Sequence, residues 1–173
     1  RAPSLRCLDV GTGSGCIGIT VALERPETTV TAIDISEEAL AVARHNAQQL
    51  GARNIDFHQI DLFDDARMQD LGTFDLIVAN PPYIAASEIA ELDSDVRDFE
   101  PQTALTDGAD GYRFHRRLAQ LLPLLGREGG NLFVELGYGQ AATVRRMFEQ
   151  AGYRNITVLT DLDKVERILW VQK

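Results

Sequence analysis

The segment Asn80-Pro81-Pro82-Tyr83 has residue types that suit the binding of a planar polar group. It follows the apolar run Phe74–Ala79, which is typical of a buried strand. Two consecutive prolines remove two backbone N–H donors and hold φ at about −65°, so neither a strand nor a helix continues through them. The resulting turn presents the Asn80 amide and the Tyr83 ring at a fixed spacing. It predicts a substrate site, although a strand-ending turn in which Asn80 caps the backbone has the same sequence.

A second candidate site is the glycine-rich turn Gly11-Thr12-Gly13-Ser14-Gly15, which follows the short apolar run Leu5–Val10. Apolar residues at helical spacing come after it, so the sequence predicts a strand, a turn and a helix. Glycines at such a turn let the backbone approach a ligand closely. Gly13 and Gly18 also fit the dinucleotide fingerprint, and Asp34 follows Gly13 by 21 residues. A nicotinamide dinucleotide is therefore one candidate ligand.

Charge separates the ligands that the glycine turn could hold. Asp9, Asp34 and Asp61 each lie at or next to the end of a predicted strand. A pyrophosphate at the turn would sit close to Asp9, and like charges repel strongly in a cleft of low effective dielectric. S-adenosylmethionine carries a positive sulfonium and a positive ammonium group, so carboxylates around the site would attract it. We therefore expect S-adenosylmethionine rather than a dinucleotide.

The residue types at the strand ends indicate how this cofactor would lie. Asp34 is expected to accept hydrogen bonds from both ribose hydroxyls, and Asp61 one from the adenine amino group. Ile35 and Leu62 would form an apolar slot around the base. The predicted cofactor-binding residues are Asp9, Gly11, Thr12, Gly13, Ser14, Gly15, Asp34, Ile35, Asp61, Leu62 and Asn80.

Alternating strands and helices must position these side chains. Apolar and β-branched runs predict the strands, and apolar residues at helical spacing predict the helices. Ser36 is expected to cap the second helix and Gly51 to end it. We expect strands at 5–10, 29–35, 55–60, 74–79, 130–136, 156–160 and 167–172, helices at 16–24, 36–50, 88–92, 112–125 and 141–151, and a long irregular connection before residue 112.

This order of elements predicts an α/β fold with a doubly wound, mostly parallel seven-stranded sheet covered by helices on both faces. Too few residues separate the last two strands for a helical crossover, so the last strand must be antiparallel. Such sheets bind ligands at the carboxyl ends of their strands. Asp34, Asp61 and Asn80 all lie at those ends, and the sequence therefore predicts one shared site.

Composition limits the class of protein and its partners. The 173 residues are 45% hydrophobic and 25% charged, which is typical of a single globular domain. No apolar run is long enough to span a membrane, so a cytoplasmic protein is expected. The 17 Lys and Arg against 26 Asp and Glu give a formal charge of −9. This charge disfavours a nucleic acid and favours a basic protein surface as the partner.

The cysteines and histidines lack the spacing of metal ligands. Cys7 lies in a predicted strand and Cys16 at the start of a predicted helix, so both are expected to be buried, reduced thiols. His45, His58 and His115 fit no catalytic position and are expected at surface or packing positions. No metal site is predicted.

Several motifs resemble those of one enzyme family. Asp9-Val10-Gly11-Thr12-Gly13-Ser14-Gly15 is similar to the first motif of Rossmann-like class I methyltransferases, and Asn80-Pro81-Pro82-Tyr83 resembles the motif of enzymes that methylate planar nitrogens. With Phe99-Glu100-Pro101, Ala104-Leu105 and Asp107-Gly108, the pattern resembles the release factor glutamine methyltransferases, the HemK/PrmC family. The resemblance covers nearly the whole chain.

This resemblance implies a cofactor, a reaction and a substrate. Residues 1–173 would form a domain that uses S-adenosyl-L-methionine to methylate the side-chain amide nitrogen of a glutamine in a peptide chain release factor. Asn80, Pro81, Pro82 and Tyr83 would be the catalytic and substrate-binding residues, with Glu100 as a further substrate-binding residue. The Asn80 side-chain oxygen and the Pro81 carbonyl would accept the two amide protons, while Tyr83 packs on the planar amide.

Two features depart from the family pattern. The family has a small amino-terminal helical domain that helps to bind the protein substrate, and this sequence lacks it. We therefore expect a fragment that binds cofactor and engages its partner weakly. The position after Asp61 is often aromatic in the family, whereas Leu62 can cover the adenine but cannot stack on it.

Two other functions stay open. A methyltransferase acting on the amino groups of adenine or cytosine in nucleic acid could use the same turn, and it should have a basic face. Arg113, His115, Arg116 and Arg117 form a local basic cluster. A non-catalytic module that binds the cofactor and regulates a partner is the other alternative, although the intact Asn80 and Tyr83 disfavour it.

Overall fold

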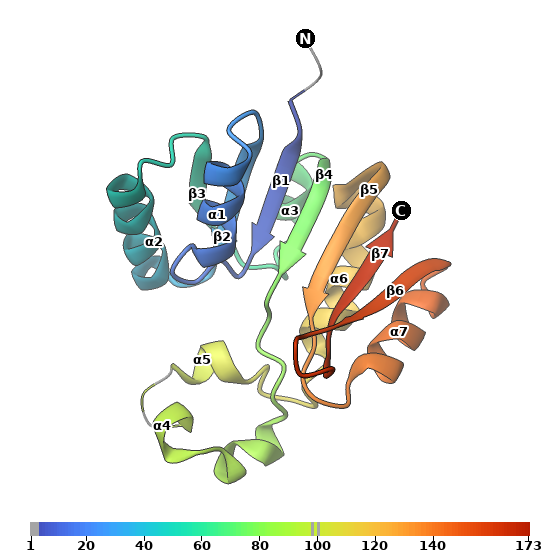
Figure 1. Cartoon of the computed structure of the whole chain (residues 1–173). Helices are drawn as coiled ribbons and strands as arrows, with labels where there is room; N and C mark the ends of the chain where they lie inside the picture. The colour runs from blue at the N-terminus through green and yellow to red at the C-terminus, as the bar shows by residue number, and fades with distance from the viewer. Residues whose placement is uncertain (1–3, 98, 100) are drawn as a thin grey trace.

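The computed structural model describes residues 4–97, 99 and 101–173. Among these residues, seven strands form one sheet in the order β3-β2-β1-β4-β5-β7-β6 (Figure 1). The strands are β1 (Arg6–Val10), β2 (Thr29–Asp34), β3 (Ile55–Gln59), β4 (Phe74–Ala79), β5 (Gly126–Glu135), β6 (Asn155–Thr160) and β7 (Glu166–Gln172). The order reverses between β1 and β4, which is where doubly wound sheets bind ligands.

The strand directions confirm the predicted topology. β1 pairs in parallel with β2 and β4, β2 with β3, and β4 with β5. The last strand, β7, lies between β5 and β6 and is antiparallel to both. A short turn joins β6 to β7, in which Asp161 Oδ1 accepts hydrogen bonds from the backbone N–H groups of Asp163 and Val165. The sheet is therefore mostly parallel with an antiparallel last strand.

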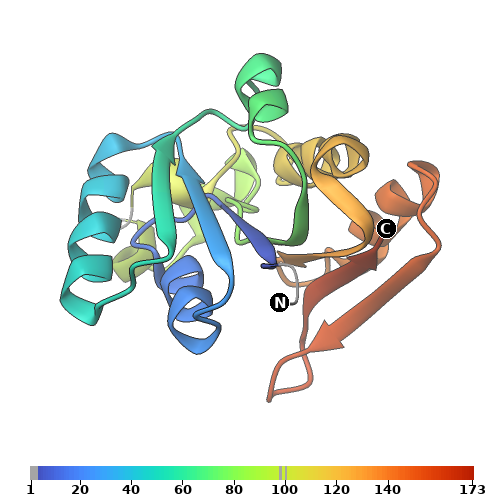
Figure 2. The same cartoon turned by 90° about the horizontal axis from the view of Figure 1, so that it is seen from above.

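Helices cover both faces of the sheet, as a doubly wound fold requires (Figure 2). On one face, α1 (Cys16–Glu24) and α2 (Glu37–Leu50) bury apolar residues in a core that includes Val30 of β2. On the other face, α3 (Asp65–Asp70), α6 (Arg113–Leu125) and α7 (Ala141–Gln150) bury a larger set that includes Leu122 and Phe148. The sheet is thus a rigid wall whose strand ends can hold side chains in fixed positions.

Helix α2 begins and ends at the residues that its sequence predicts. The Ser36 side chain accepts a hydrogen bond from the backbone N–H of Ala39 at 3.1 Å. Gly51 adopts a left-handed conformation with φ of 77°, and its N–H bonds to the last turn of the helix. Leu40, Ala43 and Ala47 are buried on one face. Local sequence therefore determines this helix almost completely, and the other predicted elements agree within a few residues.

Besides two short helices at 94–97 and 102–105, in the connection expected to be irregular, three features differ from the sequence prediction. Helix α3 was not expected: it has six residues, the Asp64 side chain caps it, and Met68 is its buried residue. Strand β5 begins at Gly126, four residues early, because Gly126 pairs with Phe74 next to an irregularity in the ladder. The expected helix at 88–92 is a 3₁₀ helix, η1, over Ala86–Glu91.

The long connection between β4 and α6 lies below the carboxyl ends of the strands (Figure 1). It contains η1 and two short helices, α4 (Ser94–Arg97) and α5 (Gln102–Leu105). Its two ends are tied together, because Ile84 N–H donates to the Leu105 carbonyl at 3.0 Å. The predicted substrate residue Glu100 lies outside the described residues. The connection is therefore placed to form one wall of a site at the strand ends.

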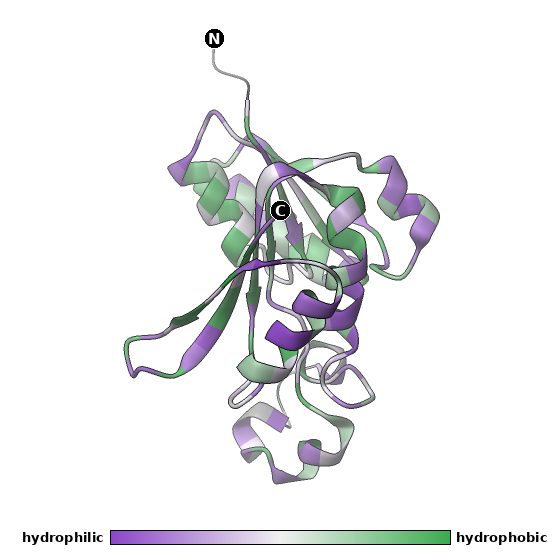
Figure 3. Cartoon of the chain, turned by 90° about the vertical axis from the view of Figure 1, so that its right-hand side faces the viewer, coloured by the Kyte–Doolittle hydropathy of each residue, from purple (hydrophilic) through white to green (hydrophobic). Residues whose placement is uncertain are grey.

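The colouring by hydropathy shows mainly hydrophobic strands and hydrophilic outer faces on the helices (Figure 3). No helix in the described part of the chain is both long and apolar enough to cross a bilayer.

Candidate active site

The register between β1 and β4 places the two predicted sites side by side. Val10 pairs with Ala79, so the glycine turn and the Asn80 turn leave neighbouring strands at the same level. A Cβ atom on Gly11 would lie 3.9 Å from the Asn80 carbonyl oxygen. A ligand held by the glycine turn therefore lies within reach of the Asn80 amide.

The glycine turn is held by backbone hydrogen bonds to the end of β2. The N–H groups of Gly11 and Thr12 both donate to the Ile33 carbonyl, at 2.9 and 3.0 Å. Gly13 has φ of 55°, which disfavours other residues, and no atom lies within 4 Å of the position that a Cβ would take. The turn therefore presents open backbone to the space in front of it.

Asp9 lies beneath this turn and is 1% exposed. Its Oδ2 accepts hydrogen bonds from Thr12 Oγ1 at 2.6 Å and from Gly18 N–H at 2.8 Å. Burial raises the pKa of Asp9, the two hydrogen bonds oppose that shift, and the nearby Asp34 charge adds to it. Asp9 therefore fixes the turn against the first turn of α1.

Gly18, the third glycine of the dinucleotide-like fingerprint, lies directly against the Asp9 side chain. A Cβ atom on Gly18 would lie 2.8 Å from Asp9 Oδ2. Gly18 therefore makes room for a buried carboxylate, which would repel a pyrophosphate rather than bind it.

Asp34, at the end of β2, faces the other side of the glycine turn. Its Oδ2 accepts a hydrogen bond from Gly13 N–H at 2.8 Å, and its Oδ1 accepts one from Ser36 N–H at 2.9 Å. A carboxylate offers about four acceptor positions on its two oxygens, so each oxygen can accept a further hydrogen bond. The carboxylate is thus pre-oriented and keeps acceptor capacity for hydroxyl groups.

Two cavities lie in front of the strand ends. The Asp34 cavity, of about 430 Å³, is lined by Asp34, Ile35, Asp61 and Leu62 together with other residues from the ends of β1 to β4. The Tyr83 cavity, of about 410 Å³, lies along the glycine turn and Tyr83. Both volumes lie within the range of about 300–1,000 Å³ that is usual for small-molecule sites. The residues that line both cavities are Gly11, Gly13, Asn80, Pro81 and Ala104.

The predicted cofactor residues divide between these cavities. Asp61 is exposed and accepts a hydrogen bond from Phe63 N–H at 2.9 Å, whereas Leu62 is buried. Ile35 is 59% exposed and lies along the same cavity as Leu62. Asp9, Thr12 and Ser14 line the Tyr83 cavity. Among the residues that the structure describes, Gly15 lines neither cavity and serves instead as the N-terminal cap of α1.

The predicted catalytic turn lies between the two cavities. Pro81 is buried and Asn80 is exposed, and both line each cavity. Pro82 lines the Asp34 cavity and Tyr83 lines the other. The Tyr83 hydroxyl lies 3.3 Å from Glu135 Oε1, to which it donates a hydrogen bond. Asn80 is therefore positioned where a ligand in one cavity meets a ligand in the other.

Three residues of the Asp34 cavity are not predicted by sequence reasoning. Phe63, Arg113 and Phe114 line it, with the Arg113 guanidinium 4.2 Å from the centroid of the Phe63 ring. Phe63 and Phe114 also make an edge-to-face contact at 5.5 Å. The sequence identifies Arg113 only as part of a basic cluster, and no sequence pattern predicts its contact with Phe63.

The Asp107-Gly108 motif has a structural role in the described chain. Asp107 is buried, and its Oδ1 accepts hydrogen bonds from the N–H groups of Ala109 and Gly111 at 2.8 and 3.0 Å. Its Oδ2 accepts one from Arg113 N–H at 2.8 Å, at the start of α6. Asp107 therefore fixes the loop that leads into α6 and the position of Arg113.

The remaining expectations on thiols and histidines have mixed outcomes. Cys7 is buried, and its burial raises the pKa of the thiol to about 12. The expectation for Cys16 is wrong: it is exposed and lines the Tyr83 cavity, because it begins α1 beside the open turn. His45 and His58 are exposed, and His115 is buried with Nε2 3.0 Å from the Glu135 carbonyl, so all three lie at surface or packing positions.

Comparison with known proteins shows which family this chain belongs to. A family model for the methyltransferase domain matches residues 2–123. The chain is 42% identical over 165 residues to the release factor glutamine methyltransferase of Bacteroides thetaiotaomicron, covering 95% of this chain and 59% of that protein. It is 45% identical over 163 residues to that of Neisseria gonorrhoeae, covering 94% of this chain and 59% of the relative. The chain thus spans less than two thirds of these relatives.

Solved structures agree with these sequence matches. The release factor-specific protein-(glutamine-N5) methyltransferase of Alicyclobacillus acidocaldarius is 30% identical, with a TM-score of 0.58 over 100% of this chain and 83% of that one. A methyltransferase from Pyrococcus furiosus has a TM-score of 0.71 at 17% identity, over 98% of this chain and 75% of that one, and shows the shared fold.

The strand order, the glycine turn and the family match define a Rossmann-like methyltransferase domain, a class that uses S-adenosyl-L-methionine as methyl donor. The site fits this cofactor, because Asp34 keeps acceptor capacity beside an apolar cavity that joins a second cavity at Asn80. Within this class, the chain belongs to the release factor glutamine methyltransferase family.

The Asp34 carboxylate generates the first prediction. Replacing it in Asp34→Ala should weaken the binding of S-adenosylmethionine by about 10- to 150-fold, which corresponds to about 1.5–3 kcal/mol for hydrogen bonds to a charged group. Isothermal titration calorimetry measures this change. Asp56→Ala, at an exposed position of β3, is the matched control and should bind normally. Unchanged affinity of Asp34→Ala for S-adenosylmethionine, or tight binding of a nicotinamide dinucleotide by the parent chain, would contradict the assignment of S-adenosylmethionine to the Asp34 cavity.

Proposed function

We propose that this domain transfers a methyl group from S-adenosylmethionine to the side-chain amide nitrogen of a glutamine in a peptide chain release factor. The position of Asn80-Pro81-Pro82-Tyr83 between the two cavities is the observation that carries the proposal. The solved relative from Alicyclobacillus acidocaldarius, which is release factor-specific, supports the choice of substrate.

The proposed cofactor contacts follow from the Asp34 cavity. Asp34 accepts hydrogen bonds from the two ribose hydroxyls while it keeps its bonds to the backbone of Gly13 and Ser36. Ile35 and Leu62 enclose the adenine, and Asp61 accepts a hydrogen bond from its amino group. Asp9 lines the Tyr83 cavity beside the glycine turn, where it would face the positively charged end of the cofactor. Because these contacts surround the glycine turn, they direct the rest of the cofactor toward Asn80.

Orientation of the acceptor amide is the main contribution of the protein to catalysis. An amide nitrogen is a poor nucleophile because its lone pair is delocalised into the carbonyl group, so holding it in line with the methyl group is the available means of acceleration. The Asn80 side-chain oxygen and the Pro81 carbonyl accept the two amide protons, and the Tyr83 ring packs against the amide plane. The bound cofactor supplies a methyl group activated by its positive sulfur.

The transfer itself requires no strong general base. With S-adenosylmethionine bound, the amide nitrogen held by Asn80 and Pro81 would take the methyl group as the bond between carbon and sulfur breaks, and one amide proton would then leave to solvent. Among the described residues, no set of three or more His, Cys, Asp or Glu side chains is arranged to hold a metal ion.

Nucleic acid is a weaker alternative substrate because the arginines of the local basic cluster are engaged in contacts within the chain. Arg116 makes two hydrogen bonds with Asp110, at 2.8 and 2.9 Å. Arg117 forms an ion pair with Asp65, and Arg113 stacks on the Phe63 ring. Binding to a phosphate backbone depends on cations that are free to contact it. The basic face expected of a nucleic-acid enzyme therefore has no support in this cluster.

Mass spectrometry of a release factor incubated with the chain and S-adenosylmethionine tests the proposed function. We expect one added methyl group on the side chain of a glutamine. Methylation of a nucleic acid with an unchanged release factor would contradict the substrate assignment and favour the nucleic-acid alternative. Cofactor binding without transfer to either substrate would favour the regulatory module instead.

Substitution of Asn80 separates acceptor orientation from cofactor binding. Asn80→Ala should slow methyl transfer by about 10²-fold or more, because the amide loses one of its two proton acceptors. The affinity for the cofactor should stay largely intact, since Asp34 and the glycine turn are unchanged. Single-turnover kinetics and calorimetry measure the two quantities. Asn155→Ala, at an exposed position of β6, is the control. An equal loss in both quantities would place Asn80 in cofactor binding alone.

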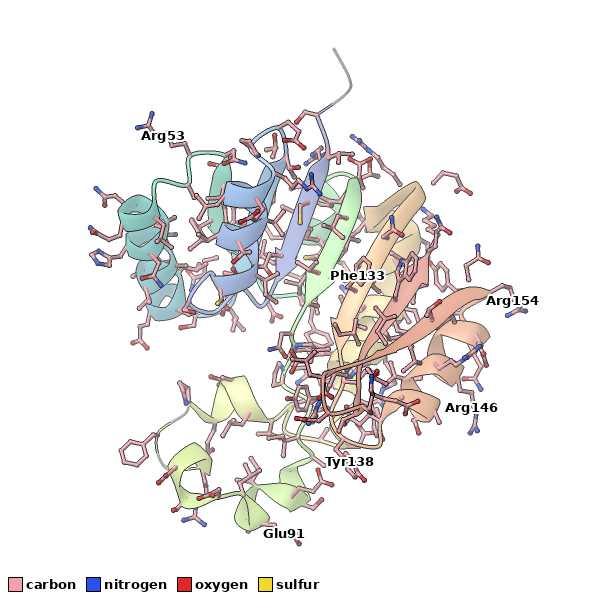
Figure 4. All side chains as sticks on the ribbon, in the orientation of Figure 1. Arg53, Glu91, Phe133, Tyr138, Arg146 and Arg154 are labelled. Carbon is pink, nitrogen blue, oxygen red and sulfur yellow. The ribbon has the colours of Figure 1, made fainter. Side chains whose placement is uncertain are left out.

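We also propose that the partner presents a basic surface to the acidic segment beside the site. The exposed carboxylates of this segment are Glu88, Glu91, Asp93 and Asp95, on and next to η1 and α4. Figure 4 shows Glu91 on the outer side of this segment, away from the sheet. Its charges add to a chain with a formal charge of −9. Such a field accelerates the encounter with a cationic surface and is screened by salt.

Stopped-flow association with the release factor should therefore slow as the ionic strength rises. The reason is that the Debye length falls from about 10 Å at 0.1 M salt to about 3 Å at 1 M. Glu88→Gln combined with Glu91→Gln should reduce the salt dependence. An association rate that does not respond to salt would contradict a charged docking surface.

A further inference from the structure

We propose that Gln140 is a positioning residue for the methyl-acceptor site, because its side-chain amide fixes the backbone of Tyr83. The inference rests on the proposed function and adds a residue that contacts neither cavity in the described part of the chain. Gln140 lies just before α7 and is 9% exposed.

The amide of Gln140 joins three segments that are far apart in the sequence. Its Oε1 accepts a hydrogen bond from Gly137 N–H at 2.9 Å, in the turn after β5. Its Nε2 donates to the Tyr83 carbonyl at 2.8 Å and to the Gly111 carbonyl at 3.4 Å. One side chain thus ties the catalytic turn to the Asp107–Gly111 loop and to the carboxyl end of β5.

Glycines occur where these segments meet most closely. A Cβ atom on Gly111 would lie 2.5 Å from the Tyr83 carbonyl oxygen, and Gly111 has φ of 79°. A Cβ atom on Gly137 would lie 3.0 Å from the Tyr83 ring and from the Gln140 amide carbon. The absence of side chains at both positions lets the two backbones approach the Gln140 amide, so the contact is part of the local fold.

Tyr83 is held at both ends by this arrangement. Gln140 fixes its backbone carbonyl, and Glu135, at the end of β5, accepts a hydrogen bond from its hydroxyl. The Tyr83 ring lines one cavity, and Tyr83 lies three residues after Asn80. Because a misplacement of about 1 Å can reduce catalysis by about 10²-fold, loss of the amide donor should affect transfer without a change in the chemical groups at the site.

The side chain of Gln140 has no role in capping α7. Its backbone carbonyl accepts hydrogen bonds from the N–H groups of Thr143 and Val144, and its side chain makes no capping bond to the helix. Substitutions of the side chain therefore leave the start of α7 intact and test the contact with Tyr83.

Two variants and one control test the proposal. Gln140→Ala removes the amide, whereas Gln140→Glu keeps the acceptor for Gly137 N–H and places a carboxylate against two carbonyl oxygens. Gln150→Glu makes the same change at an exposed position of α7 and should behave like the parent chain. The measurements are single-turnover transfer to the release factor, calorimetry with S-adenosylmethionine, and hydrogen exchange of peptides covering residues 83–86 and 109–112.

We expect transfer to slow by about tenfold or more in both Gln140 variants at neutral pH, with cofactor affinity within about twofold of the parent chain. Transfer by Gln140→Glu should recover as the pH falls, because a protonated carboxyl group can again donate to the Tyr83 carbonyl. The segments that Gln140 joins also carry the titratable groups Asp107, Asp110, Glu135 and Tyr138, and His115 of α6 lies against the Glu135 carbonyl. Their contribution is measured by the same pH profile on the parent chain and on Gln150→Glu.

Hydrogen exchange gives a result that does not depend on the substrate. Exchange should become faster at residues 83–86 and 109–112 in Gln140→Ala and stay unchanged in α2. Transfer at the parental rate in both variants, or unchanged exchange at these residues, would overturn the proposal. A loss of transfer matched by an equal loss of cofactor affinity would also overturn it. If the parent chain does not methylate the release factor, the proposed function fails, and the exchange data alone decide whether Gln140 fixes Tyr83.

Discussion

The parallel register between β1 and β4 is the constraint on which the whole site depends. It brings the glycine turn and the Asn80 turn out of the sheet at the same level, from two neighbouring strands. Without that register, the two turns would not line one shared site. The sheet is covered by helices on both faces, so a slip of one residue would move buried side chains to the wrong face. The packing of the core therefore also maintains the relative position of the two turns.

Buried and partly buried carboxylates surround this Rossmann-like glycine turn. Asp9 and Asp34 both accept hydrogen bonds from backbone N–H groups of the glycine turn or of α1. These bonds use donors that would otherwise be free for an anionic phosphate. Gly18 makes room for Asp9, so the glycine that completes a dinucleotide-like spacing here accommodates a negative charge. A positively charged cofactor gains from this arrangement, and a pyrophosphate would lose.

The Asn80 turn is held in place differently from the Asp34 side of the site. Strand ends and the glycine turn hold Asp9, Asp34 and Asp61, whereas the Asn80 turn depends on segments that arrive from 30 to 60 residues further along the chain: the Asp107–Gly111 loop, the end of β5 and Gln140. Prolines fix the backbone of the turn locally, and Gln140 and Glu135 fix where Tyr83 lies within the fold. Local stiffness and distant hydrogen bonds thus act together on one ring and one amide.

The sequence by itself determined the features that local physical chemistry controls. Consecutive prolines end β4, Ser36 and Gly51 bound α2, and a short final turn makes β7 antiparallel. It did not determine α3, whose six residues are too few for a periodic signal, nor the early start of β5 in a glycine-rich stretch. Only the tertiary structure brought Phe63 against Arg113 and Gln140 against Tyr83. The physical reason is that such contacts depend on which segments meet at the carboxyl ends of the parallel strands, and this packing leaves no periodic pattern in the residues that take part.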